Sequence, residues 1–133
     1  MIVDASAIVA VVRREPDRER LLTALSTSQR NIMSAANYLE AAIVVDGSRD
    51  PALSRYFEDF LGAAEMMIES VTERQAQIAR EAYRDYGRGS GHPARLNFGD
   101  CFAYALARDR QEPLLFKGED FHHTDIEPAL DPR

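Results

Sequence analysis

The amino-acid sequence predicts an α/β fold with a mostly parallel central sheet flanked by helices. Short apolar runs alternate along the chain with longer stretches of helical character, which is the order of elements expected for such a sheet. The 133 residues, of which 45% are hydrophobic and 29% charged, have the length and composition of an ordinary globular domain. We therefore expect one domain over residues 1–133.

The predicted strands are short apolar runs bounded by polar or turn-forming residues. Each run is too short for a helix, and several contain the β-branched residues that strands favour. The order of the strands in the sheet does not follow from these runs. In chain order, the predicted strands cover residues 1–3, 31–33, 66–71 and 114–116.

The first three predicted helices follow recognisable start signals. Small aliphatic residues directly after Asp4 indicate a buried helix. Pro16 suits the first turn of a second helix, because a proline there removes no helical hydrogen bond. Ser34 is a good N-cap for the third helix. These helices are expected over residues 5–12, 16–27 and 35–46.

The last three predicted helices begin with equally clear signals. Asp50 followed by Pro51 combines a cap with a first-turn proline, and Thr72 stands three residues before Gln75, which is the spacing of a capping box. Asn97 can cap the final helix. The glycine-rich, basic segment before it is expected to be a loop. The helices are expected over residues 51–64, 73–86 and 98–110, and the loop over 87–96.

Composition and charge limit the function classes. No apolar run approaches the roughly 20 residues of a membrane span, so we expect no membrane segment and a cytosolic protein. The single Cys101 cannot form an internal disulfide, which agrees with a reducing compartment. A net charge of −6 argues against a protein that coats nucleic acid through overall basicity. Any binding of nucleic acid must then be local and helped by bound cations.

Four acidic residues are expected to meet at one edge of the sheet. Asp4 and Asp120 each follow a predicted strand, and the carboxyl ends of parallel strands share one edge. Asp100 lies in the first turn of the last helix, near the positive end of its dipole. Glu40 stands beside a strongly apolar helical stretch, where a carboxylate that has no functional role is less expected. Clustered carboxylates repel one another, and a hard divalent cation such as Mg²⁺ or Mn²⁺ relieves that repulsion.

Four segments of the chain resemble the motif regions of PIN-domain ribonucleases, and in particular those of VapC-type toxins of bacterial toxin–antitoxin modules. The segments read MIVDASAIVA, SAANYLEA, LNFGDCFAYALA and LLFKGEDF, and the resemblance extends over essentially the whole chain. It implies a PIN-like three-layer domain, a metal-dependent ribonuclease inhibited by a small antitoxin with a basic tail, and a homodimer. The acidic metal-site positions implied by the resemblance are Asp4, Glu40, Asp100 and Asp120.

The resemblance also bears on neighbouring residues. It favours Asp120 over the adjacent Glu119 as the last metal-facing acid. Ser6 takes a small-hydroxyl position, where it is expected to hydrogen-bond a metal ligand or a bound water. The second motif is slightly altered around Asn37, whose role stays open. Candidate contacts to RNA are Ser6, Arg13, Arg14, Arg88, His92, Arg95 and Lys117.

Residue chemistry supports phosphodiester hydrolysis independently of the resemblance. Two cations about 3.5 to 4 Å apart can activate a water and stabilise the leaving oxygen, so the protein need supply only carboxylates. Taken singly, each acid also has a structural explanation as a turn former, a cap or a solvated residue. A catalytically silent module whose acidic pocket binds a basic partner segment therefore stays open as an alternative. The aromatic pair Phe98 and Phe102 is expected to pack in the core.

Overall fold

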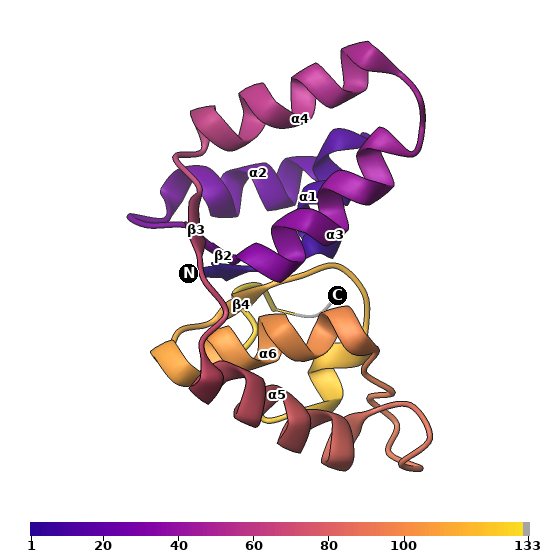
Figure 1. The fold of residues 1–133 in the computed structure, drawn as a ribbon. Helices are drawn as coiled ribbons and strands as arrows, with labels where there is room; N and C mark the ends of the chain where they lie inside the picture. Colours follow the sequence, from indigo (N-terminus) through magenta and orange to yellow (C-terminus); the bar gives the residue numbers. More distant parts are fainter. Residues whose placement is uncertain (132–133) are drawn as a thin grey trace.

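Four parallel strands form the centre of the computed structural model, which describes residues 1–131 (Figure 1). The middle strand β1 pairs with both β2 and β4, and β2 pairs in addition with β3. The order is therefore β3-β2-β1-β4, and the predicted parallel sheet is confirmed. The strands are β1 (Ile2–Val3), β2 (Ile32–Ser34), β3 (Met67–Glu69) and β4 (Leu114–Leu115).

Helices cover both faces of the sheet, which gives the three layers of the fold (Figure 1). Helices α1 to α4 pack on one face, and α5 and α6 pack on the other. None of the helices in the described range is long and apolar enough to cross a membrane. The helices are α1 (Ala5–Val12), α2 (Arg18–Thr27), α3 (Ala35–Asp46), α4 (Pro51–Ala63), α5 (Glu73–Tyr86) and α6 (Phe98–Arg110), with a short 3-10 helix η1 (Asp120–His123).

The alternation of side chains along the strands divides the core in two. Ile2, Ile32 and Leu114 lie in register across the sheet and join the cluster formed with α5 and α6. The following residue of each strand points to the opposite face, as a strand period of two requires. These following residues are Val3, Met33 and Leu115, and they belong to the cluster formed with α1 to α4.

The predicted helix caps are present, with one difference. The Ser34 side chain accepts the N–H of Ala36 at 3.3 Å, and Thr72 Oγ1 accepts the N–H of Gln75 at 3.1 Å. The Gln75 side chain does not return the second bond of a capping box, because its amide donates to Asp109 on α6 instead. That contact ties α5 to its neighbour in the same layer.

The expected start of the second helix at Pro16 is wrong, because α2 begins at Arg18. The backbone N–H of Arg18 donates to the carbonyl of Glu15 at 2.9 Å, so Pro16 occupies a turn before the helix. Proline favours such a turn because its ring fixes the backbone angle φ. The predicted third strand over 66–71 also shortens to Met67–Glu69.

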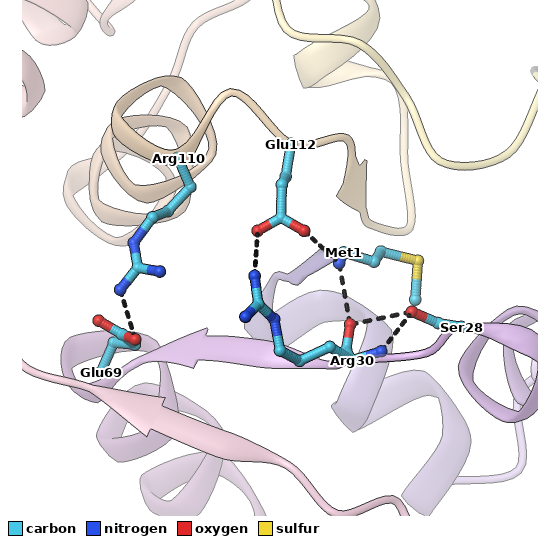
Figure 2. Close-up of polar contacts among 6 residues, drawn as sticks. All are labelled: Met1, Ser28, Arg30, Glu69, Arg110 and Glu112. Atoms are coloured by element: carbon cyan, nitrogen blue, oxygen red, sulfur yellow. Dashed lines mark hydrogen bonds and ion pairs between the residues drawn. The ribbon is translucent and has the colours of Figure 1, made fainter.

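Ion pairs stabilise the region where β1 and β4 begin. The Met1 amino group lies 2.9 Å from Glu112, whose other carboxylate oxygen lies 3.7 Å from the Arg30 guanidinium (Figure 2). A second pair joins Arg110 at the end of α6 to Glu69 on β3 at 2.5 Å (Figure 2). Partly exposed pairs of this kind contribute about 0 to 1 kcal/mol each.

The segment after η1 extends the sheet beyond β4, which the sequence did not indicate. The N–H of Leu114 donates to Glu127, and the N–H of Ala129 donates to the Leu114 carbonyl, at 2.9 and 2.8 Å. Leu114 and Pro128 form an isolated parallel bridge. The outer backbone of β4 is therefore covered.

Candidate active site

The four acidic residues lie after the strands or on the helices that begin beside them. Asp4 follows β1 and caps α1, and Asp120 begins η1 after β4. Asp100 stands in the first turn of α6, and Glu40 lies on α3, whose N-cap Ser34 ends β2. The parallel strands carry these side chains to a common edge.

Asp4 is almost fully buried, with 3% of its surface exposed. Its Oδ2 accepts the backbone N–H of Ser6 at 3.0 Å, whereas its buried Oδ1 has no hydrogen-bond partner within residues 1–131. Burial raises the pKa of Asp4 to about 6, and repulsion from Glu40 adds to the rise, while the bonds from Ser6 oppose it. One buried carboxylate oxygen of Asp4 is thus not satisfied by any group in the described part of the chain.

Asp100 is held by a complete capping box at the start of α6. Its Oδ2 accepts the N–H of Asn97, and its own N–H donates to Asn97 Oδ1, both at 2.9 Å. Burial raises the pKa of Asp100 to about 6, and the charges of Asp4 and Asp120 raise it further, whereas the Asn97 bond and Arg88 lower it. The cap fixes the direction of the carboxylate without neutralising it.

Glu40 reaches the same acids from α3. Burial is the main cause that raises the pKa of Glu40, and the charge of Asp100 contributes in the same direction. The amide of Asn37 donates to Glu40 Oε1 at 3.1 Å and opposes this rise. Glu40 is therefore half-buried, hydrogen-bonded and close enough to Asp100 to be repelled by it.

These mutual effects join the four carboxylates into one electrostatic cluster. The charge of Glu40 raises the pKa of Asp4, and the charge of Asp100 raises the pKa of Glu40. The charges of Asp4 and Asp120 both raise the pKa of Asp100. Within residues 1–131, no three His, Cys, Asp or Glu side chains are grouped as ligands of one metal ion. The side chains that could bind a cation are nonetheless all carboxylates, and Asp4 Oδ1 has no partner in the described part of the chain. This donor chemistry fits a hard divalent cation, which prefers oxygen ligands.

A family model described as "PIN domain" matches residues 1–127. The chain belongs to the PIN-domain family. It is 56% identical to ribonuclease VapC28 of Mycobacterium tuberculosis over 133 residues, which is 100% of each chain. It is 51% identical to ribonuclease VapC42 of the same organism over 129 residues, covering 97% of this chain and 98% of the relative. The comparisons confirm the predicted family and the predicted function class, that of VapC ribonuclease toxins.

Solved structures share the same PIN fold. The crystal structure of VapC20 from M. tuberculosis, described as a sarcin–ricin loop cleaving toxin, matches with a TM-score of 0.76 at 15% identity and 98% coverage of both chains. A toxin–antitoxin complex from Klebsiella pneumoniae matches with a TM-score of 0.66 at 13% identity, covering 90% of this chain and 88% of that one. At such low identity the likeness concerns the fold alone.

Ser6 and Lys117 connect two segments at the edge of this PIN domain. The backbone N–H of Lys117 donates to Ser6 Oγ at 3.0 Å, so the start of α1 is tied to the segment after β4 that leads to Asp120. The Lys117 ammonium pairs with Glu15. Gly118 follows with φ of 104°, a conformation that favours glycine. Ser6 thus helps to place two of the acids.

The structure does not bring Arg13 and Arg14 to the acids. Asp4 caps the start of α1, whereas these arginines follow its last residue, Val12. Eight helical residues span about 12 Å at 1.5 Å per residue. Their contact with RNA stays a prediction, and it would require a strand that runs along α1.

The basic loop over residues 87–96 contributes one side chain near the acids. Arg88 lowers the pKa of Asp100 through its charge, and it is exposed. His92 packs edge-on against Tyr86 with ring centroids 4.8 Å apart, which indicates a structural role within the loop. Arg95 is exposed and has φ of 50°. Of this group, Arg88 is the best placed to meet a phosphate beside the acidic cluster.

Sequence reasoning left Asn37 without a role and did not single out Gly99. Asn37 Nδ2 donates to the Gly99 carbonyl at 2.9 Å as well as to Glu40. The available signals were an amide inside an apolar helix and a glycine directly before Asp100. The expectation that Phe98 packs in the core is wrong, because 77% of its surface is exposed. Phe102 is partly buried and contacts Phe98 edge-on.

We expect Asp4→Asn to stabilise the metal-free protein at neutral pH. The folded-state pKa of Asp4 is about 6, against an ordinary value of 3.8, so the protonated carboxyl favours folding. This contribution is complete below about pH 4 and is lost as the pH rises through about 6. In urea unfolding with chelator, the stability of the variant relative to wild type should therefore increase between about pH 4 and 7, by a few kcal/mol at about 1.4 kcal/mol per pKa unit.

The exposed Asp59 on α4 provides the control, because Asp59→Asn makes the same substitution outside the acidic cluster. Excess Mn²⁺ should reverse the order of stability, since it binds the folded wild type more tightly than the variant. If chelated Asp4→Asn is less stable than wild type at every pH, Asp4 is chiefly a structural cap.

Proposed function

We propose that this chain is a metal-dependent endoribonuclease that hydrolyses RNA phosphodiester bonds with Mg²⁺ or Mn²⁺. We propose further that it acts in the cytosol as the toxin of a toxin–antitoxin pair. The observation that supports the reaction is the acidic cluster, in which four carboxylates from separate segments repel one another and a buried Asp4 oxygen has no hydrogen-bond partner among the described residues. The similarity to VapC ribonucleases supports the substrate class.

Each acid has a task that follows from its position. Asp4 and Asp100 are the proposed fixed ligands, because backbone N–H groups hold one oxygen of each. Glu40 approaches from α3, and Asp120 is exposed on η1. A bound cation would lower the pKa of a coordinated water and neutralise charge on the phosphate.

The basic residues are proposed to bind RNA locally. The net charge of −6 opposes a general attraction to RNA, so the phosphates must meet individual cationic side chains. Arg88 is the strongest candidate, because its charge already acts on Asp100. Lys117 would have to exchange its pairing with Glu15 for a phosphate.

The proposed activity requires the acids. We expect purified protein to cleave RNA only with Mg²⁺ or Mn²⁺, and Asp4→Asn or Asp100→Asn to reduce the rate by more than about 100-fold, beyond the usual loss for an outer-shell partner of a metal ligand. The matched pair at the last motif is Asp120→Asn, which should lose activity, and Glu119→Gln, which should keep it. Gel assays on an RNA panel with each metal and with chelator measure these rates.

Two outcomes would contradict parts of this proposal. Equal cleavage by wild type and both variants, after removal of contaminating nuclease, would reject the metal-site assignment. Failure of folded, metal-supplied wild type to cleave any RNA would favour the alternative, a silent module whose acidic pocket binds a basic partner segment.

A small antitoxin is proposed to inhibit by placing an arginine or lysine of a basic tail among the carboxylates. A guanidinium makes bidentate bonds to carboxylates and can substitute for the charge of a metal. We expect replacement of every basic residue in the tail of the cognate antitoxin to weaken inhibition of RNA cleavage, measured as an inhibition constant. A variant antitoxin with neutral substitutions outside the tail is the control. Undiminished inhibition would mean a remote or purely steric mechanism.

A homodimer is proposed from the distribution of exposed apolar side chains. Helix α3 contacts both β3 and α6, and all three elements expose large apolar residues, which mark interaction surfaces when they adjoin. We expect wild type to be a dimer in size-exclusion chromatography with light scattering, Ile43→Lys to be a monomer, and Thr23→Lys on α2 to stay a dimer. A monomeric wild type would reject this proposal. The exposed set is Leu39, Ile43, Met67, Ile68, Val71, Tyr83 and Phe98.

A further inference from the structure

The amide of Asn37 lies between the Glu40 carboxylate and the backbone of α6. Its Nδ2 donates to Glu40 Oε1 at 3.1 Å and to the Gly99 carbonyl at 2.9 Å, and the side chain is 0% exposed. A carboxylate and a carbonyl only accept hydrogen bonds, so the amide nitrogen must face them. The contact therefore joins α3 to α6 directly beside Asp100.

Gly99 provides the space for the Glu40 carboxylate. A Cβ atom at Gly99 would lie 2.0 Å from Glu40 Oε2 and 2.6 Å from its Cδ. Gly99 stands in the first turn of α6 and is not among the glycines with positive φ. The backbone conformation at position 99 is compatible with alanine, but the Cβ of an alanine would clash with the Glu40 carboxylate.

A comparison with Asn31 separates this contact from an ordinary structural one. Asn31 Nδ2 donates to the carbonyls of Leu25 and Ala64 at the ends of α2 and α4, where carbonyls lack helical donors. Asn37 instead serves a carboxylate and a carbonyl in the first turn of α6, which can already accept a helical bond. Both asparagines leave a buried Oδ1 without a partner in the described range, which costs about 1 to 3 kcal/mol.

We propose that Asn37 and Gly99 are positioning residues that seat the Glu40 carboxylate beside Asp100. Asn37 holds one oxygen of Glu40 by hydrogen bonding, and the missing side chain of Gly99 admits the other. The inference rests on the proposed function, and it assigns to these two residues the alignment of the acid from α3 with the acid from α6.

The first test measures Mn²⁺ binding by calorimetry, without RNA. Asn37→Leu has a similar volume and removes both the donor and the unpaired acceptor. We expect about 10- to 100-fold weaker Mn²⁺ binding, the range found when an outer-shell partner of a metal ligand is lost. Asn31→Leu is the matched control, and it should lower the urea midpoint while Mn²⁺ affinity stays that of wild type.

A second variant reaches the same carboxylate without touching Asn37. Gly99→Ala should displace Glu40 and weaken Mn²⁺ binding without lowering the urea midpoint, because alanine favours helix over glycine. Gly62→Ala on α4 is its control, since nothing lies within 4 Å of the added Cβ. This pair tests the inference even if Asn37→Leu does not fold.

The outcomes distinguish the positioning role from the proposed function. Wild-type Mn²⁺ affinity in folded Asn37→Leu and Gly99→Ala would overturn the positioning role, and a loss in Asp4→Asn in the same experiment would leave the metal site standing. An equal loss of affinity in Asn31→Leu would also overturn it, because the effect would then be general destabilisation. If wild type binds no Mn²⁺ and cleaves no RNA, the proposed function fails, and the inference fails with it.

Discussion

Repulsion among carboxylates at the edge where β1 and β4 end is the constraint on which the arrangement of this PIN domain depends. Helix dipoles offset part of this repulsion, because Asp4 caps α1 and Asp100 lies in the first turn of α6. The positive ends of two helices therefore face the same acids. This compensation is incomplete, since burial still raises the pKa of both groups to about 6. A bound divalent cation would offset the repulsion that remains.

The sequence predicts those features whose signals are local. An acid after a strand, a cap such as Ser34 and an asparagine three residues before Asp100 each depend on a few neighbouring residues, and the structure places them as expected. Parallel strands then bring acids far apart in sequence to one edge without further information. The ends of short strands were less certain, because β3 exposes both Met67 and Ile68 and has little burial pattern to define it.

Features that depend on the direction of an element or on contacts between layers were not predictable in the same way. Phe98 and Phe102 have helical spacing, but spacing does not say which face of α6 is covered, and Phe98 is exposed. Arg13 and Arg14 follow a helix that starts at the acids and therefore ends away from them. The hydrogen bond from Asn37 to Gly99 joins residues 62 positions apart, and no local sequence pattern predicts it.

The two buried asparagines show what separates a positioning residue from a structural one. Asn31 and Asn37 each direct one amide nitrogen to two acceptors, and each leaves one oxygen without a partner within residues 1–131. Burial and the number of hydrogen bonds therefore do not distinguish them. The acceptors do, because both carbonyls bound by Asn31 lie at helix ends and need a donor for folding. Asn37 instead binds one carbonyl, that of Gly99, and one carboxylate, that of Glu40. The Asn37 amide therefore fixes the position of one carboxylate in the acidic cluster in addition to joining α3 to α6, and a fixed arrangement of carboxylates is what a metal site requires.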